Sequence, residues 1–351
     1  MKSNNRIAYK VKVVTLAFAV SVGLTARAQE SSSKIPSYLS ISGFIDNQYS
    51  YESQQNNDGS YTELNTLNIR RARFDVKGSF NEHLEFRLQA DFAGSPKIVD
   101  AYVKYKFNKL VNIELGQFKT PFTLENQYSP LNLESIENSQ VISSLSGYSD
   151  VLGGKRNNGR DIGVVLYGDL LNSSDGTFPL VSYNIGVFNG SGINTKDENL
   201  SKDVIGRLDI HPFIKDLVLS ASAVKGAYYD GTDGNAGNNR FSFGAEFKDE
   251  ALTVRSEYVR ADYQNGGTWL KADGFYVLAG YWFKLGNDQK LRPVVKYDHF
   301  NRNDVNSDLY LVGIDWWLES HLRLQLNYTL REREQFDKKS NTVAAMVSIK
   351  F

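Results

Sequence analysis

The sequence predicts an all-β protein, a transmembrane antiparallel β-barrel of about sixteen strands, from three observations. Segments of roughly ten residues alternate apolar and polar side chains, which is the period of a strand with two different faces. Short and long connections alternate along the chain. Aromatic residues are abundant (20 Tyr, 20 Phe and 4 Trp), and beyond residue 28 no apolar run approaches the roughly 18 residues of a membrane helix. A barrel reconciles these features, because only every second residue of its strands faces lipid.

The first 28 residues have the pattern of a secretory signal peptide. Four basic residues precede an apolar run over residues 13–24, and an A-x-A cleavage site follows at residues 26–28. The segment holds five basic residues and no acid, so its removal from a chain with 40 of each leaves 35 basic and 40 acidic side chains. That near balance favours neither nucleic acid nor anionic lipid as a partner. We expect a signal peptide at 1–28, a flexible segment at 29–37 and a barrel over 38–351.

Sixteen alternating segments follow, an even number that places both ends of the barrel chain on one side of a membrane. They span residues 38–52, 64–79, 83–92, 98–107, 111–119, 160–170, 180–189, 203–211, 217–228, 240–248, 252–263, 274–285, 290–300, 308–317, 321–332 and 341–351. The longer polar connections include 53–63, 190–202, 230–239 and 264–273. A soluble β-sandwich, which composition alone leaves open, has no reason to sort its loops in this way.

The last strand shows its two faces clearly. Val343, Ala345, Val347, Ile349 and Phe351 form one apolar set, which we expect to face lipid. An aromatic last residue closing such a strand resembles the C-terminal signature of bacterial outer-membrane β-barrels. Elsewhere the second face is charged, as in strands 83–92 and 321–331, which suits a water-filled lumen.

The connection over residues 120–159 is much longer than the others. Alternation fails there, and long loops without regular structure are usually functional or disordered. Several aliphatic residues, including Leu124, Ile136 and Leu145, indicate that it packs against something. Inside a wide barrel the available surface is the lumen wall, so we expect this third external loop to fold inward.

Three motifs resemble the phosphate-selective porin O and P family. Residues 70–78 (RRARFDVKG) resemble its second-strand motif, and residues 115–122 (LGQFKTPF) resemble its junction with the constriction loop. Residues 159–164 (GRDIGV) resemble its return to the next strand, and the three motifs occur in family order. The resemblance implies a sixteen-stranded outer-membrane porin, usually a homotrimer, with the third loop narrowing the pore.

The loop departs from the founding members of that family, which select phosphate with arginines on the constriction loop and a ladder of lumenal bases. Here residues 120–154 contain no Lys or Arg, and basic residues return only at 155, 156 and 160. The loop instead carries four acids, Glu125, Glu134, Glu137 and Asp150. We therefore predict a channel without a strong phosphate preference.

Strand alternation and the motifs nominate a set of basic residues for the pore. Their side chains either form an anion pathway, with guanidinium groups contacting passing carboxylate or phosphate, or pair with acids of the same face. For most of them we favour mutual pairing. These candidates are Arg71, Arg73, Arg87, Lys104, Lys106, Lys119, Arg156, Arg160, Arg207, Arg255 and Arg323.

The hairpin over residues 64–92 illustrates the pairing. If residues 79 and 83 close its turn, the register opposes Arg71 with Asp91, Lys77 with Glu85, and Asp75 with Arg87. That register leaves Arg73 opposite Gln89, as the best candidate for an unpaired lumenal cation.

Catalytic and metal chemistry find little support. Cysteine is absent, the four His lie on separate strands, and no G-x-S-x-G occurs, so we expect no enzyme, no metal and no cofactor. Residues 230–235 have calcium-like oxygen spacing but lack the acid that completes an EF-hand loop, and we interpret them as an external loop. Aromatic residues near strand ends are interpreted as an interfacial girdle, with a lumenal sugar-stacking track as the alternative; they are Tyr228, Tyr229, Tyr281, Trp282, Trp316 and Trp317.

Together these patterns predict a porin in the outer membrane of a Gram-negative bacterium. Its partners would be the lipid bilayer, small polar solutes or anions, and two further copies of the chain, with no nucleic acid. The alternatives are an uptake channel selective for phosphate or an oligosaccharide and, from another class, an outer-membrane enzyme or an adhesin.

Overall fold

The computed structural model describes residues 36, 38–56, 58–152, 156–197, 199–229, 235–286, 288–334 and 338–351. Residues Ile41–Phe351 form one compact unit. The predicted signal peptide, nearly all of segment 29–37, and residues 230–234 of the calcium-like loop lie outside the described residues. In the described part, no helix combines the length and apolar character needed to cross a membrane.

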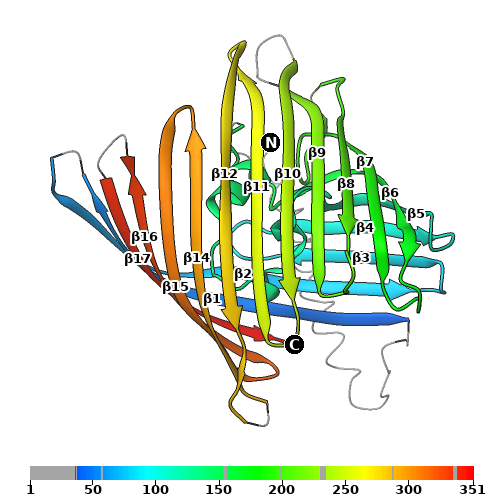
Figure 1. The fold of residues 1–351 in the computed structure, drawn as a ribbon, viewed down its shortest axis with the longest axis horizontal. Coiled ribbons are helices and arrows are strands. Elements are labelled where there is room, and N and C mark those ends of the chain that lie inside the picture. Colours follow the sequence, from blue (N-terminus) through cyan, green and yellow to red (C-terminus); the bar gives the residue numbers. More distant parts are fainter. Residues whose placement is uncertain are drawn as a thin grey trace, which may run out of the picture. The chain divides into compact units, whose positions relative to one another are not determined.

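The unit is built almost entirely of strands (Figure 1). They are β1 (Leu39–Gln55), β2 (Tyr61–Ser79), β3 (Leu84–Asp91), β4 (Lys97–Lys106), β5 (Asn112–Lys119), β6 (Arg160–Asn172), β7 (Pro179–Phe188), β8 (Asp203–Ile210), β9 (Leu217–Tyr229), β10 (Asn235–Lys248), β11 (Leu252–Asn265), β12 (Thr268–Tyr281), β13 (Phe283–Lys284), β14 (Lys290–Arg302), β15 (Val305–Glu319), β16 (Leu322–Arg333) and β17 (Lys338–Lys350).

Pairing of the first and last strands closes the sheet into a barrel. Strand β1 pairs antiparallel with β17 from Phe44 opposite Lys350 to Gln54 opposite Ser340, and it also pairs with β2. Both β12 and the two-residue β13 pair with β14, so they are one strand interrupted at Trp282. The predicted sixteen-stranded antiparallel barrel is therefore confirmed.

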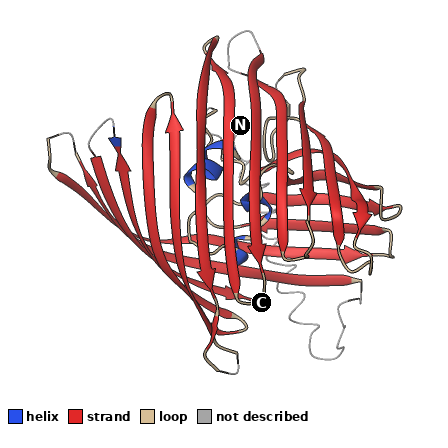
Figure 2. Cartoon of the chain, in the orientation of Figure 1, coloured by secondary structure: helices blue, strands red, loops and turns tan. Residues whose placement is uncertain are grey.

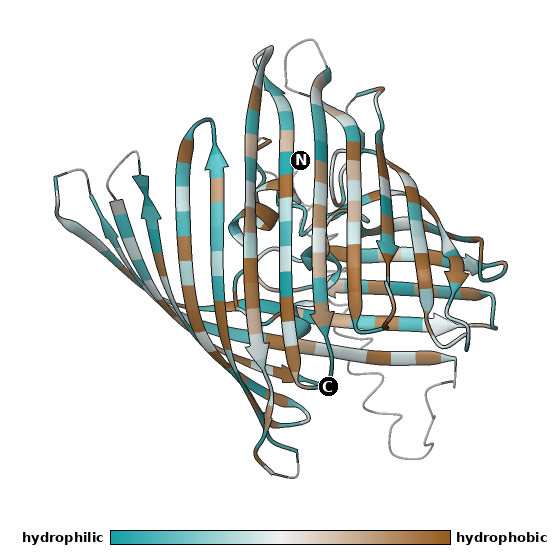
Figure 3. Ribbon diagram, in the orientation of Figure 1, coloured by the Kyte–Doolittle hydropathy of each residue, from teal (hydrophilic) through white to brown (hydrophobic). Residues whose placement is uncertain are grey.

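The two faces of the sheet alternate as predicted. In β17 the side chains of Val343, Val347 and Ile349 are exposed, whereas those of Met346 and Ser348 are buried. Figure 3 shows the same alternation as bands of brown and teal along the strands. The exposed apolar face suits lipid, and the opposite face is the inner face of the barrel.

Several hairpins are longer than the sequence indicated. The predicted loop 264–273 is mostly strand, because β11 and β12 run on to a two-residue turn at Gly266-Gly267. Both glycines have positive φ, 55° and 80°, the conformation that a tight hairpin turn requires. Similarly, β1, β2 and β10 extend into the predicted loops 53–63 and 230–239. Lipid-facing alternation marks only the apolar band of a strand, and pairing continues into the polar part beyond it.

The predicted register of the second hairpin is wrong by two residues. Arg73 lies opposite Asp91, Asp75 opposite Gln89, and Lys77 opposite Arg87. Arg73 also forms an ion pair with Asp91, Nε to Oδ2 3.1 Å, so it is not the unpaired cation that the sequence suggested. The turn closes one residue later in the chain than assumed, between Phe80 and Leu84, because the Phe80 N–H donates to the Leu84 carbonyl.

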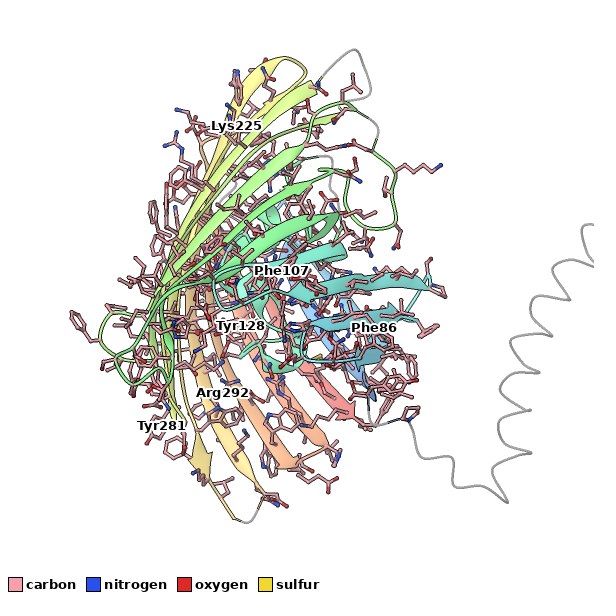
Figure 4. All side chains as sticks on the ribbon, turned by 90° about the vertical axis from the view of Figure 1, so that its right-hand side faces the viewer. Phe86, Phe107, Tyr128, Lys225, Tyr281 and Arg292 are labelled. Carbon is pink, nitrogen blue, oxygen red and sulfur yellow. The ribbon has the colours of Figure 1, made fainter. Side chains whose placement is uncertain are left out.

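The girdle interpretation holds for only part of the aromatic set. Tyr281, labelled in Figure 4, is exposed on the outer face. Tyr228, in contrast, is buried and donates its hydroxyl to the Gln264 carbonyl. Trp282 and Trp317 are inward as well, because each contacts basic side chains of the inner face. Alternation breaks near these strand ends, where β12 is interrupted and a register shift follows Trp317.

The long connection between β5 and β6 contains three short helices. They are η1 (Glu125–Gln127), η2 (Pro130–Asn132) and α2 (Gln140–Leu145), drawn in blue in Figure 2. The side chains of Val141, Ile142 and Leu145 are fully buried in a cluster that includes Val259 and Tyr276 of the wall. The aliphatic residues of this segment therefore pack against the inner face of the sheet.

The seam between β1 and β17 provides a test of barrel closure. A Cβ on Gly43 would lie 2.4 Å from the Arg73 carbonyl oxygen and 2.5 Å from the ring of Phe351. We expect Gly43→Ala to lower the free energy of unfolding by about 1–3 kcal/mol, because the backbone must shift. Heat-dependent gel mobility of the refolded protein measures this loss. Gly206→Ala is the matched control, since no atom lies within 4 Å of its added Cβ; equal melting of the two variants would contradict the prediction.

Candidate functional site

Glu134 of the long loop is the centre of the charged contacts on the inner face. Its side chain is 1% exposed and lies between Arg255 of β11, Nη2 to Oε2 2.8 Å, and Arg292 of β14, Nη1 to Oε1 3.3 Å. Lys248 of β10 is 4.0 Å away. A loop acid that the sequence placed at a constriction is thus enclosed by bases of the wall.

The contacts continue in both directions from Glu134. Arg292 also binds Asp315 of β15, Nη2 to Oδ2 2.5 Å, and Asp315 is shared with Arg323 of β16, Nε to Oδ1 2.6 Å. On the other side Arg255 binds Glu246 of β10, Nε to Oε2 2.6 Å. The result is an alternating chain of three acids and three bases, which we call the charge chain: Glu246, Arg255, Glu134, Arg292, Asp315 and Arg323.

The remaining loop acids are also matched. Glu137 accepts two bonds from Arg70, Nη1 to Oε1 2.5 Å and Nη2 to Oε2 2.7 Å. Asp150 accepts two from Arg240 of β10, at 2.8 and 2.9 Å. Glu125 stays within the loop, where it accepts the backbone N–H and the hydroxyl of Ser139.

The wall also binds the loop backbone. The Glu257 carboxylate accepts the N–H groups of Leu124 (2.8 Å) and Glu125 (3.2 Å), which begin the η1 turn. Asp298 of β14 accepts the N–H of Gln140 at the start of α2. Arg323 donates to the carbonyls of Leu131 (2.8 Å) and Leu133 (2.6 Å). Orphan backbone groups at the helix ends thereby find partners.

Tyr128 adds an aromatic contact to the same wall. The Arg255 guanidinium lies 4.3 Å from the centre of its ring and the Lys248 ammonium 4.4 Å. Its hydroxyl donates to Glu246. Burial, together with the neighbouring Glu246 carboxylate, raises the pKa of the Tyr128 hydroxyl, so it remains a donor at neutral pH. Figure 4 labels Tyr128 and Arg292.

A cavity of about 260 Å³ lies between the loop and the opposite wall, β2 to β6. Five bases and two acids line it, Arg73, Arg87, Lys104, Lys119 and Arg160 with Asp100 and Glu114. We call this the basic cavity. Lys119 differs from the other four bases, because its ammonium donates to the loop carbonyls of Asn126 (2.6 Å) and Tyr128. Among the described residues, no carboxylate forms an ion pair with it.

Ion pairs confirm that most candidate bases bind acids. Arg87 bridges Asp75 (2.9 Å) and Asp100 (3.1 Å), and Arg160 binds Asp100 from the other side (2.6 Å). Five further candidates each bind one acid: Arg71 with Asp46, Arg73 with Asp91, Lys104 with Glu114, Lys106 with Glu85, and Arg207 with Asp209. Arg255 and Arg323 belong to the charge chain, and Arg156 is exposed.

Strand parity missed Arg70 and Arg240. Strand alternation places the neighbours Arg70 and Arg71 on opposite faces, yet the guanidinium group of Arg70 reaches Glu137 and that of Arg71 reaches Asp46. Arg240 begins an inward set with Ser242 and Glu246, opposite the outward Phe241 and Phe243. That alternation was visible in the sequence and would have identified Arg240.

No group of three or more His, Asp or Glu side chains in the described residues is arranged to hold a metal ion. The expectation that the chain is not an enzyme remains a prediction.

Comparisons with known proteins agree with this geometry. A sequence profile described as "Phosphate-selective porin O and P" matches residues 44–251. Among curated proteins none matches the chain. An anion-selective porin from Comamonas acidovorans has a similar structure, with a TM-score of 0.68 and 13% identity, over 89% of this chain and 99% of that one.

Two further solved structures share the fold. The trimer form of OmpT from Vibrio cholerae has a TM-score of 0.61 at 13% identity, covering 89% of this chain and 99% of its own. The outer membrane channel DcaP of Acinetobacter baumannii has a TM-score of 0.60 at 15% identity, covering 89% and 97%. At such identities the likeness shows the barrel fold and nothing finer.

Removing the Glu134 charge tests the charge chain. In Glu134→Gln, Arg255 and Arg292 lose their shared partner while staying buried, which costs about 3–5 kcal/mol of stability. We expect a lower melting temperature and larger fluctuations of the single-channel current, because the loop is less firmly held. Glu82→Gln, at a side chain that is 86% exposed, is the control and should leave both unchanged. A Glu134→Gln protein with wild-type melting and wild-type current noise would contradict the prediction.

The same contact predicts a pH dependence. Burial alone would raise the pKa of Glu134, but Arg255, Arg292 and Lys248 outweigh it, so the pKa lies below the ordinary value of 4.5. The stabilisation is complete above pH 4.5 and is lost as the pH falls below that value, through the folded-state pKa. We expect the difference in melting temperature between wild type and Glu134→Gln to shrink in strong acid. A difference that is constant from neutral to acid pH would exclude this linkage.

Proposed function

The chain belongs to the phosphate-selective porin O and P family and is an outer-membrane channel for small solutes; from that premise we propose that it passes small polar or anionic solutes by passive diffusion. The solutes would cross a water-filled lumen that the 120–159 loop narrows. Selectivity would follow from the size and charge of the opening left between the loop and the wall.

One observation supports this most directly. The loop is bound to β10, β11 and β14 through the charge chain and Asp298, and the basic cavity lies between the loop and β2 to β6, where Arg70 and Lys119 also reach the loop. Around the charge chain the bound side is packed with buried side chains, including those of Arg255 and Arg323. A permeating solute would therefore pass along the basic cavity, beside Lys119 and Arg160.

The charge distribution favours a weak anion preference. The three loop acids nearest the wall are neutralised by arginines, so they do not repel anions as free carboxylates would. Most wall bases are paired as well, and a paired guanidinium attracts a passing anion less than a free one. Lys119 donates to the loop carbonyls of Asn126 and Tyr128 instead of binding a carboxylate, and it lies in a narrow place where screening is weak. We propose modest anion selectivity without a strong phosphate site.

The biological setting is proposed on the same basis. The A-x-A pattern at residues 26–28 supports removal of residues 1–28 during export from a Gram-negative cytoplasm. Assembly as a homotrimer is supported by the family and by the trimer form of the structurally similar OmpT. Chemical cross-linking of the purified protein in detergent tests the trimer.

Reversal potentials in a potassium chloride gradient test the selectivity. We expect the wild type to prefer chloride modestly, and Lys119→Gln to reduce that preference several-fold in permeability ratio, because the unpaired charge is removed. Lys284→Gln is the control, since that side chain is 81% exposed, and it should behave as wild type. Chloride current blocked by micromolar phosphate, with the block lost in Arg160→Ala, would instead show that the wall rebuilds a phosphate site.

A further inference from the structure

A second cavity lies at the end of the barrel where the short turns are. It measures about 470 Å³ and is bounded by loop residue Leu131 and by side chains from strands β10 to β17. Its walls carry two indole rings, Trp282 and Trp317, and four bases, Lys248, Lys290, Arg292 and Lys350. We call it the mouth cavity. None of the roles described above uses Lys290, Lys350 or the two indoles.

The indole rings position the basic groups. The Lys290 ammonium lies 4.6 Å from the Trp282 ring centre and the Arg292 guanidinium 4.3 Å. The Lys350 ammonium lies 4.8 Å from the Trp317 ring centre, and the Arg323 guanidinium 5.6 Å. Cation–π contacts of this length hold a flexible lysine at a fixed place without neutralising its charge. Such a lysine remains available to an anion.

The four bases of the mouth cavity differ in whether a carboxylate lies close to them. Arg292 is occupied by Glu134 and Asp315, and Lys248 lies 4.0 Å from Glu134. Lys290 and Lys350 have no carboxylate within 4.0 Å among the described residues. Asp288 and Glu319 also line the cavity, but both are exposed at its rim. Two fixed ammonium groups thus face an opening beside aromatic and aliphatic surface.

We propose that the mouth cavity binds small organic carboxylates that carry a ring, with the carboxylate between Lys290 and Lys350 and the ring against the indole edges and Leu131. The volume suits a molecule of this size. Inorganic phosphate would meet the charges but leave the apolar surface unused. The site rests on the proposed function only in requiring that the lumen be open to solutes.

Titration of the chloride current with benzoate, acetate and phosphate tests the site in planar bilayers. We expect half-block by benzoate at a concentration about tenfold below that of acetate, since ring stacking contributes at this scale. The double variant Lys290→Gln/Lys350→Gln should raise the half-blocking concentration of benzoate about tenfold or more. Trp317→Leu should bring the half-blocking concentration of benzoate close to that of acetate. Lys284→Gln, at an exposed lysine of β13, is the matched control, and its current should be blocked by benzoate as that of the wild type is.

Two outcomes would overturn the proposal. Equal block by benzoate and acetate in the wild type would show that the indoles only hold the lysines. Benzoate block that survives the double variant would place the binding elsewhere. If a variant forms no channels, equilibrium dialysis of radiolabelled benzoate with the detergent-solubilised protein replaces the current, and undiminished binding by the double variant has the same meaning. A channel without chloride preference that is still blocked by benzoate would contradict the proposed selectivity and leave this site standing.

Discussion

The charge chain is the interaction on which the inner structure of this barrel depends. Glu134 is its one member from the loop, and without it the pairs of β10 and β11 are separated from those of β14, β15 and β16. Buried charges are costly to desolvate, and they are tolerated here because each of the three acids of the charge chain binds an arginine at 3.3 Å or less. A single loop carboxylate thus ties five strands to one segment of backbone.

That arrangement determines where charge remains for solutes. Arginines that bind the loop are no longer free to attract anions, and the loop acids they bind no longer repel them. In the basic cavity four of the five bases bind acids, and only Lys119 directs its donors to loop carbonyls instead. The acidic composition of the loop therefore says little about the selectivity of the channel, since it is the unpaired charge that a solute meets.

Aromatic rings contribute on both faces of the same sheet. On the outside, Phe243, Tyr258 and Phe275 lie opposite one another on the neighbouring strands β10, β11 and β12. On the inside, Tyr128, Trp282 and Trp317 each hold two cations. The inner rings reduce the cost of placing basic groups close together, because each ring presents its negative face to them.

The sequence by itself determined the fold class, the number of strands, the outward face of β17 and the aliphatic packing of the long loop, since alternation and apolar content are local properties. It also indicated that lumenal charges would mostly pair. Only the tertiary structure decided the partners: Arg73 with Asp91, Glu134 with Arg255 and Arg292, and the inward side chain of Trp317. Those pairings join residues up to 158 positions apart. They depend on turn geometry and barrel closure, which the alternation of side chains along a strand does not specify.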